Sequence, residues 1–278
     1  MDFIEEYRFS IIIVCFNANG KLKKTIDSII SQDYKNYQIV IKDGGSEDGT
    51  LDCLSEYEGK NIDIKVEVSP DQGIYDAMNQ AVSLCDGDYI YFLNTGDYFE
   101  NPKVLATVNK ELYLVNGTHF EGPPPHIVYG NILDRTTGKV VMSNPKINGF
   151  ALYRNVPCHQ ACFYQKRLLT EHPFNTEYKV RADYEHFLWC CYEKKAKTYH
   201  VDKLIADYEG GGYSAVNVKI SKAEHKIITE KYMSSGELFK YRMILALTLS
   251  PLRTKMAESK LTAGFYNGLK SLIYKLRK

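Results

Sequence analysis

The sequence predicts an α/β fold: a mostly parallel, Rossmann-like β-sheet with helices on both faces, followed by C-terminal helices. Short runs of continuous apolar residues recur through the first half of the chain, and such runs are typical of strands buried on both faces. Segments of helical length, with apolar residues at helical spacing, separate these runs. The composition is that of a globular protein, because 44% of the 278 residues are hydrophobic and 25% are charged.

The first half of the chain alternates between the two patterns. The apolar run FSIIIVCF predicts a strand over 9–16, and similar runs predict strands over 37–42, 62–68 and 88–94. Before the last of these, residues 74–85 carry apolar side chains at helical spacing, which predicts a helix with one buried stripe. Repetition of strand, helix and strand with fully apolar strands indicates parallel pairing.

The alternation breaks in the second half. Two further strands are expected over 127–133 and 139–142, followed by a helix over 183–195 and a strand over 198–206. A glycine-rich loop, YEGGGYS, comes next, and helical segments continue to the last residue. The second half therefore predicts a mixed arrangement rather than a continued parallel sheet.

Polar clusters follow several of the expected strands at their C-terminal ends. Asn17, residues 43–46 and Asp71 occupy such positions, and the run IYFLN ends in a polar turn that carries Asp97. Ligands of parallel sheets bind beyond the carboxyl ends of the strands. A buried strand that delivers a single carboxylate to this edge predicts a ligand site there.

Several classes of protein are disfavoured. The loop NANGKLKKT contains neither a dinucleotide-binding glycine motif nor a P-loop, and no G-x-S-x-G elbow of a hydrolase is present. A formal net charge of +1 gives no indication of nucleic acid as a partner. The seven cysteines are an odd number and lie mostly in apolar segments, which is typical of free thiols in a reducing cytosol. The opening MDFIEEYRF has no basic segment typical of a secretory signal.

The polar clusters resemble the motifs of family 2 glycosyltransferases with the GT-A fold. DGGSEDGT closely resembles that family's signature, and the later blocks follow in the family's order and spacing. The resemblance covers about residues 9–214. The matching segments are DGGSEDGT (43–50), DQGIYDAMNQAV (71–82), GDYIYFLNTGDYF (87–99), CHQACFY (158–164), RADYEHFLW (181–189) and GGGYS (210–214).

The resemblance implies roles on the side of the sugar-nucleotide donor. Asp43 would accept a hydrogen bond from the base, expected to be uracil, and Phe16 matches an aromatic position near that base. Family members often have Arg where this chain has Met78, so a phosphate contact from that position is missing. The expected donor-binding residues are Phe16, Asn17, Asp43, Asp71, Gly73, Asn79 and Asn94.

The resemblance also implies a metal ligand, a catalytic base and an acceptor side. Asp97 matches the last acid of the metal-binding D-x-D element, and Mg²⁺ or Mn²⁺ takes its other oxygen ligands from water and substrate phosphates. Asp183 matches the catalytic base, although an Asp that opens a helix is also a routine N-cap. His159 and Gln160 are expected on the acceptor side, and a packed structural histidine is the alternative for His159.

The resemblance implies an inverting glycosyltransferase that moves a sugar from a nucleotide donor, expected to be UDP-linked, to a hydroxyl of a lipid-linked oligosaccharide. The product would be a bacterial surface polysaccharide such as capsule, O-antigen or exopolysaccharide. Two alternatives stay open: a sugar-1-phosphate nucleotidyltransferase, and a non-catalytic binding or scaffold protein that keeps the fold. The catalytic domain is expected over 1–214 and a helical region over 215–278.

The last segment carries a separate pattern. Over 260–278, apolar residues fall on one helical face and lysines and arginines occupy the rest. A basic amphipathic helix predicts binding to an anionic membrane surface, which would place the protein in the cytoplasm at the inner face of the membrane. The alternative is a helix that packs on its own domain or on a partner.

Overall fold

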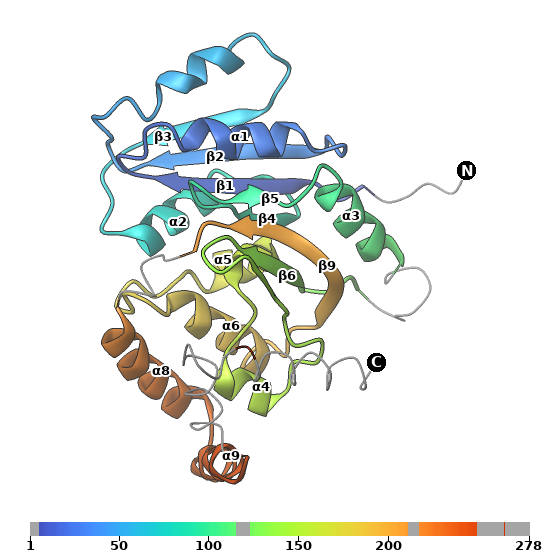
Figure 1. Cartoon of the computed structure of the whole chain (residues 1–278), viewed down its shortest axis with the longest axis vertical. Coiled ribbons are helices and arrows are strands. Elements are labelled where there is room, and N and C mark those ends of the chain that lie inside the picture. The colour runs from blue at the N-terminus through green and yellow to red at the C-terminus, as the bar shows by residue number, and fades with distance from the viewer. Residues whose placement is uncertain (1–5, 115–122, 211–216, 249–263, 265–278) are drawn as a thin grey trace. The chain divides into compact units, whose positions relative to one another are not determined.

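The computed structural model describes residues 6–114, 123–210, 217–248 and 264 (Figure 1). The chain divides into two compact units, Met1–Ile228 and Thr229–Lys278. The expected division after residue 214 stays a prediction. The basic amphipathic segment 260–278 lies outside the described residues except for residue 264.

One mixed sheet of nine strands lies in the described part of the first unit. The order across the sheet is β3-β2-β1-β4-β8-β6-β9-β5, and β7 pairs with β6 outside this path. The first four strands are parallel, and β8 runs antiparallel to both β4 and β6. The strands are β1 Phe9–Cys15, β2 Tyr37–Asp43, β3 Ile64–Val68, β4 Tyr89–Phe92, β5 Tyr98–Phe99, β6 Ile127–Asp134, β7 Lys139–Val141, β8 Cys162–Gln165 and β9 Thr198–Tyr208.

Helices alternate with the strands of the first unit, and α9 lies in the second unit (Figure 1). Among the described residues, no helix is long and apolar enough to cross a membrane. The helices are α1 Leu22–Ile30, α2 Ile74–Val82, α3 Val104–Leu114, α4 Gly149–Arg154, α5 Lys166–Glu171, α6 Ala182–Tyr192, α8 Val218–Tyr232 and α9 Ser235–Leu247, with 3₁₀ turns η1 Asp52–Tyr57 and η3 His159–Ala161.

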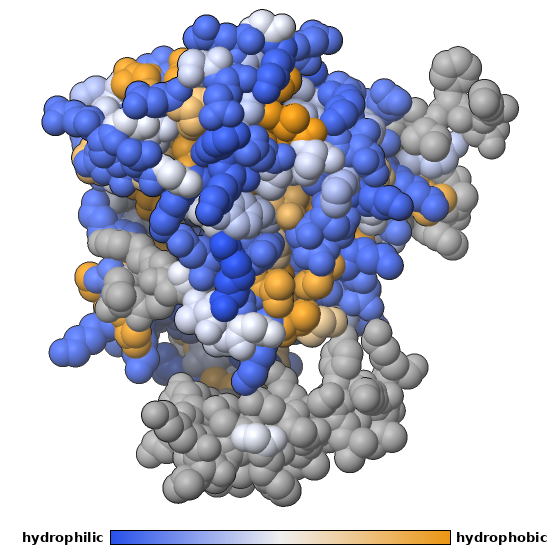
Figure 2. Space-filling model, turned by 45° about the horizontal axis from the view of Figure 1, so that its top comes forward, coloured by the Kyte–Doolittle hydropathy of each residue, from blue (hydrophilic) through white to orange (hydrophobic). Residues whose placement is uncertain are grey.

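Strand β1 is the centre of the fold. All seven of its residues are buried. The Phe9, Ile11 and Ile13 side chains of β1 pack in one apolar core with buried residues of α1. Helix α2 packs against β1 and β2. Burial of one large aliphatic or aromatic side chain contributes roughly 1.5–3 kcal/mol, so these contacts hold the strand firmly. The face shown in Figure 2 is mainly hydrophilic, with hydrophobic residues in small groups between.

The predicted α/β class with a mostly parallel sheet is confirmed. The strands expected over 9–16, 37–42 and 127–133 appear within one residue of their predicted bounds. The short strand β5 was not predicted, because two residues are too few for any periodic pattern. Its place is set by antiparallel pairing with β9, which is distant in the sequence.

Candidate active site

A cavity of about 630 Å³ lies beyond the carboxyl end of β4. Strand β1 pairs with β2 on one side and with β4 on the other, so the chain adds β2 and β3 along one edge of β1 and then returns to add β4 along the other edge. Open α/β sheets bind their ligands in the crevice at such a switch point. The turn that follows β4 reaches the cavity wall, and η3, the start of α2 and the start of α6 supply other parts of it.

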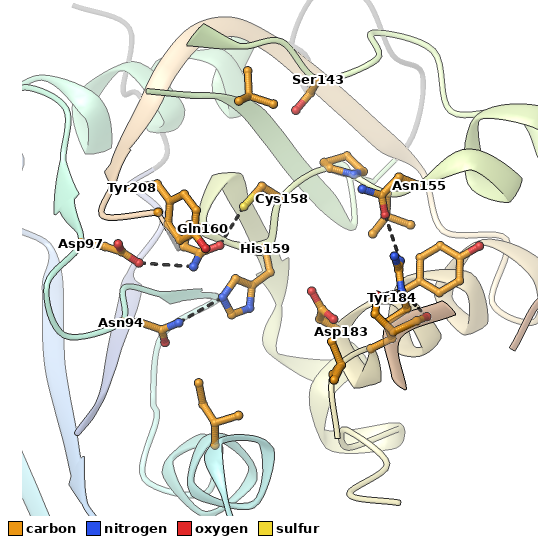
Figure 3. Close-up of a pocket in the computed structure, with 18 of the residues that line it drawn as sticks. Asn94, Asp97, Ser143, Asn155, Cys158, His159, Gln160, Asp183, Tyr184 and Tyr208 are labelled. Carbon is orange, nitrogen blue, oxygen red and sulfur yellow. Dashed lines mark hydrogen bonds between the residues drawn. The ribbon is translucent and has the colours of Figure 1, made fainter. Parts of the chain in front are cut away.

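Five of the predicted site residues meet in this cavity. Asn94, Asp97, His159, Gln160 and Asp183 all line it, although they come from three separate segments of the chain. Figure 3 shows Asn94 and Asp97 on one side, Asp183 on the other and the His159 ring between them. The structure therefore brings together the residues expected for metal binding, for base catalysis and for the acceptor side.

The Asp97 carboxylate is almost completely buried, with 3% of its surface exposed. Its Oδ1 accepts a hydrogen bond from the Glu209 backbone N–H at 2.7 Å, and its Oδ2 accepts one from Gln160 Nε2 at 3.3 Å. Burial raises the pKa of Asp97 to about 6, because these two bonds only partly replace the lost water. A bound cation would provide the missing charge compensation.

Asn94 and His159 carry two unsatisfied polar atoms. Asn94 Nδ2 lies 3.3 Å from His159 Nε2, and the His159 ring stacks on Phe92 with ring centroids 6.2 Å apart. Burial lowers the pKa of His159, so the ring is neutral at pH 7. Asn94 Oδ1 and His159 Nδ1 are buried without a hydrogen-bond partner in the described structure. Buried polar atoms without a partner are rare, and in a cavity wall they point to a ligand.

The oxygen atoms around Asp97 fit a hard divalent cation. Among the described residues, no group of three or more His, Cys, Asp or Glu side chains could hold a metal ion alone. Asp97, Asn94 and Glu209 nevertheless line the same cavity and offer carboxylate and amide oxygens. Mg²⁺ and Mn²⁺ prefer such oxygens and take the rest of their shell from water and phosphate. The role of Asp97 as a metal ligand stays a prediction.

Gly96 allows the turn after β4 to pass close to the β9 end. Its φ of 99° lies in the left-handed region, and a Cβ at this position would lie 2.6 Å from Glu209 Oε2. Glu209 itself forms an ion pair with Lys21 at 2.7 Å. Sequence reasoning missed Glu209, whose only signal was its place at the start of the glycine-rich loop.

Asp183 lies in the first turn of α6, and the alternative that it is the N-cap is wrong, since the N-cap is Arg181. Asp183 Oδ1 accepts a hydrogen bond from the Tyr75 hydroxyl, with the two oxygens 3.0 Å apart. The same hydroxyl lies 2.9 Å from the backbone oxygen of Val180. One hydroxyl proton cannot serve both acceptors fully, so Tyr75 has two alternative partners. Sequence reasoning missed Tyr75, although it lies within a matched block.

Phe16, Gly44 and Asp71 lie close together but are not among the residues that line the cavity. The Phe16 ring is 63% exposed. A Cβ at Gly44 would lie 2.8 Å from Asp71 Oδ2 and 3.2 Å from Phe16 Cδ2, so only glycine fits without a shift. Two contacts fix the Asp71 carboxylate. Its Oδ1 accepts a hydrogen bond from the Gly73 N–H at 2.9 Å, and the buried Lys42 ammonium lies 3.7 Å from its Oδ2.

Asp43 is fully engaged inside the protein. Its carboxylate accepts hydrogen bonds from the N–H groups of Gly45 and Ser46, from the Ser46 hydroxyl and from the Cys15 thiol. Burial would raise the pKa of Asp43, but these bonds outweigh burial and hold the pKa below its usual value. The geometry assigns Asp43 to the turn over 43–46, and its contact with a nucleotide base stays a prediction.

Asn17 and Asn79 are engaged in the same way. Asn17 Oδ1 accepts from the Glu47 N–H at 3.1 Å, which ties the end of β1 to the turn after β2. The Asn79 side chain exchanges two hydrogen bonds with the Phe174 backbone, at 2.8 and 2.9 Å. Both side chains hold loops that border the site, and their direct contacts with a donor stay predictions.

Comparison with known proteins agrees with this geometry. The profile described as "Glycosyl transferase family 2" matches residues 10–139. A "PGL/p-HBAD biosynthesis glycosyltransferase" of Mycobacterium bovis (strain BCG / Pasteur 1173P2) is 34% identical over 211 residues, which cover 74% of this chain and 78% of the relative. "UDP-Glc:alpha-D-GlcNAc-diphosphoundecaprenol beta-1,3-glucosyltransferase WfaP" of Escherichia coli is 32% identical over 175 residues, covering 53% of this chain and 69% of the relative.

Solved structures show the same fold at low identity. S. aureus TarS 1-349 superposes with a TM-score of 0.60 at 19% identity, and the match covers 72% of this chain but only 60% of that one. The mannosyltransferase PcManGT from Pyrobaculum calidifontis, in complex with GDP-Man and Mn²⁺, gives 0.61 at 14% identity and covers 97% and 86%.

Fold and sequence together define a glycosyltransferase with the GT-A fold. The chain belongs to family 2 of the glycosyltransferases. This membership decides between the three functions that the sequence left open, in favour of the transferase and against the nucleotidyltransferase and the scaffold.

The raised pKa of Asp97 predicts a pH-dependent stability. The folded protein binds the Asp97 proton more tightly than the unfolded chain, because the folded pKa of about 6 exceeds the ordinary 3.8. Without divalent metal, this contribution should be complete below about pH 4 and lost as pH rises through 6. The loss should approach roughly 3 kcal/mol in the free energy of unfolding.

Urea unfolding at several pH values between 4 and 7 measures this contribution. The Asp97→Asn variant removes the titration, so the difference in unfolding free energy between wild type and variant should change steadily across that range. The contributions of the other titrating groups to the unfolding free energy are the same in both proteins and cancel in this difference. A difference independent of pH would show that Asp97 is ionised in the folded protein throughout.

Proposed function

We propose that this family 2 glycosyltransferase transfers a sugar, with inversion at the anomeric carbon, from a UDP-linked donor to a hydroxyl of a lipid-linked oligosaccharide. The acceptor would belong to the synthesis of a bacterial surface polysaccharide. The observation that carries the proposal is Asp183, which faces Asn94 and Asp97 across a single cavity (Figure 3). A base and a metal-binding edge on opposite walls suit in-line displacement at a sugar between them.

The names of related proteins support the choice of substrates. WfaP is named for UDP-Glc as donor and for a GlcNAc-diphosphoundecaprenol acceptor. TarS 1-349 has been solved in complex with UDP-GlcNAc. PcManGT and the mycobacterial glucosyl-3-phosphoglycerate synthase were solved with Mn²⁺ and a nucleotide. We therefore expect UDP and a divalent ion, Mn²⁺ or Mg²⁺, on the donor side.

On the donor side, Asp97, Asn94 and Glu209 would hold the divalent ion. The ion would supply positive charge for the departing diphosphate. Asn94 Oδ1 has no hydrogen-bond partner among the described residues and Asp97 is buried with few donors, so both would gain from an added cation. The exposed Phe16 ring provides a flat apolar surface on which a nucleotide base can stack.

On the acceptor side, Asp183 would take the proton of the attacking hydroxyl. Tyr75 acts as a positioning residue, because its hydroxyl donates to the ionised Asp183 carboxylate. After proton transfer, the protonated carboxyl can donate to the Tyr75 oxygen while the Tyr75 proton turns to Val180 O. A hydrogen bond between the two side chains is thus kept before and after the chemical step.

Removal of the Asp97 carboxylate tests the donor side. Asp97→Ala should abolish the extra affinity that Mn²⁺ gives to UDP and abolish transfer with it, while metal-free UDP binding persists. Asn94→Asp adds a second acid and should preserve or tighten the Mn²⁺-dependent affinity. Calorimetry with and without Mn²⁺ measures the UDP affinity of each variant.

Two results would contradict the donor side. Equal UDP affinity of the wild type with and without Mn²⁺ would refute the metal site. Failure of the wild type to hydrolyse or transfer sugar from any UDP-sugar would refute the donor class.

Conservative changes at Asp183 and Tyr75 test the acceptor side. Asp183→Asn keeps the shape, so UDP affinity should stay near wild type while kcat falls about 10²-fold or more. Tyr75→Phe removes the hydrogen bond that positions the Asp183 carboxylate, so kcat should fall while UDP affinity stays near wild type. Tyr37→Phe is the matched control, since its ring is buried outside the cavity. Wild-type kcat in Asp183→Asn would rule out Asp183 as the base, and His159 would be tested next.

The proposed location is peripheral, at the inner face of the cytoplasmic membrane. In the second unit, α9 exposes Phe239, Met243 and Leu247, which are four residues apart and lie on one helical face. Apolar exposure of this kind supports an interfacial helix. The full-length protein should sediment with vesicles that contain phosphatidylserine and be released by high salt. Equal binding to neutral vesicles, or none to either kind, would contradict this location.

A further inference from the structure

We propose that the wall of the cavity around Asp183 carries an anion subsite, formed by Arg154, Lys179 and Arg181, which binds a phosphate group of the acceptor. The inference rests on the proposed transfer reaction and narrows its acceptor to a saccharide attached through a phosphate or diphosphate ester. All three cations line the cavity.

The three cations come from two segments that a hydrogen bond joins. Arg154 is the last residue of α4, and Lys179 and Arg181 flank Val180 immediately before α6. Arg181 Nη1 donates to the side-chain oxygen of Asn155, the neighbour of Arg154, at 3.3 Å. Figure 3 shows Asn155 and this bond on the same side of the cavity as Asp183 and Tyr184. The two segments therefore bring three basic residues to one part of the cavity wall.

In the described structure, the three positive charges have no carboxylate as an ion-pair partner. Within the described parts of the chain, none of the three cations forms an ion pair with a carboxylate, whereas Lys21 pairs with Glu209 and Arg135 with Asp207. The carboxylates that line the cavity are engaged elsewhere: Asp97 by backbone and amide donors, Asp183 by Tyr75 and Glu209 by Lys21. The buried Glu224 carboxylate lies against this segment, but it accepts from the backbone N–H groups of Lys179, Val180 and Arg181 and forms no ion pair with their side chains in the described structure. The Lys179 ammonium donates to the Thr176 backbone oxygen at 2.9 Å. An anion would therefore find three cations that no carboxylate pairs with directly.

Arg181 is held in place before any ligand arrives. Its Nε donates to the backbone oxygen of Ser221 at 2.9 Å and to the Ser221 hydroxyl at 2.8 Å. The guanidinium carbon lies 5.3 Å from the centroid of the Tyr184 ring. Nη2 makes no hydrogen bond within the described structure, so it can still donate. A fixed planar guanidinium with free N–H groups is well suited to the oxygens of a phosphate.

The position distinguishes this subsite from that of the donor diphosphate. The donor phosphates are expected beside Asp97 and Asn94, on the opposite wall. Arg181 lines the same cavity as the proposed base Asp183, so an anion held at Arg181 would lie in the space that the acceptor sugar occupies. A phosphate ester on the acceptor sugar would lie both near Asp183 and away from the donor phosphates. A phosphate of the donor nucleotide would not.

Binding of inorganic phosphate to the enzyme saturated with UDP and Mg²⁺ tests the subsite, because UDP fills the donor side. The ³¹P signal of phosphate should show saturable binding to the wild type. The double variant Arg154→Gln/Lys179→Gln leaves the Arg181 contacts intact and should weaken binding about tenfold or more. The control Lys103→Gln/Lys110→Gln removes the same charge from exposed positions outside the cavity and should bind as the wild type does.

Two esters identify the source of the phosphate. Tighter binding of n-decyl phosphate than of methyl phosphate, lost in the same double variant, assigns the subsite to a lipid-linked acceptor. Equal binding of both esters, with the same loss, assigns it to a water-soluble phosphorylated glycan. The proposal is overturned if the UDP-loaded wild type does not bind phosphate, or if the double variant binds it equally well. Failure of UDP to bind at all would instead refute the proposed transfer function.

Discussion

The parallel pairing of β1 with both β2 and β4 is the constraint on which the site depends. Because β1 is buried on both faces and paired along both edges, the turns after β2 and β4 must emerge at the same end of the sheet. Hydrogen bonds tie these turns to the strand: the Thr95 hydroxyl donates to Val14 O at 2.9 Å, and the Gly44 N–H donates to Cys15 O at 3.0 Å. The turn that carries Gly44 and the turn that carries Asp97 are thus positioned by the same core strand.

Two buried aspartates at this edge differ in chemistry because they differ in hydrogen-bond donors. Asp43 accepts from two backbone N–H groups, a hydroxyl and a thiol, and its pKa lies below the usual value. Asp97 accepts from one backbone N–H and one amide, and its pKa rises to about 6. Of the two, Asp97 has the electrostatic need that a metal ion would meet, whereas Asp43 is already satisfied. Their positions in the sequence could not distinguish these environments.

Most of the sheet could be predicted because continuous apolar runs such as that of β1 are local signals. The convergence of Asn94, Asp97, His159, Gln160 and Asp183 was predicted from motifs, and the structure brings these residues to one cavity. Contacts between distant segments could not be predicted in the same way. The bond from Tyr75 to Asp183 spans 108 residues, and the bond from the Glu209 N–H to Asp97 spans 112. The two hydrogen bonds between Asn79 and the Phe174 backbone could not be predicted either, because an Asn in a donor motif gives no indication of its partner.

Among the described residues, the charges that line the cavity balance in number but are separated in space. They are three carboxylates, Asp97, Asp183 and Glu209, and three cations, Arg154, Lys179 and Arg181. Direct ion pairs between the two sets are absent from the described residues, so neither set neutralises the other at close range. Electrostatic complementarity gives specificity more than affinity, since a wrongly charged group is repelled. Under the proposed function, the wall with Asp97 and Glu209 would favour a substrate that arrives with a cation, and the wall with Arg154, Lys179 and Arg181 would favour an acceptor that carries its own negative charge.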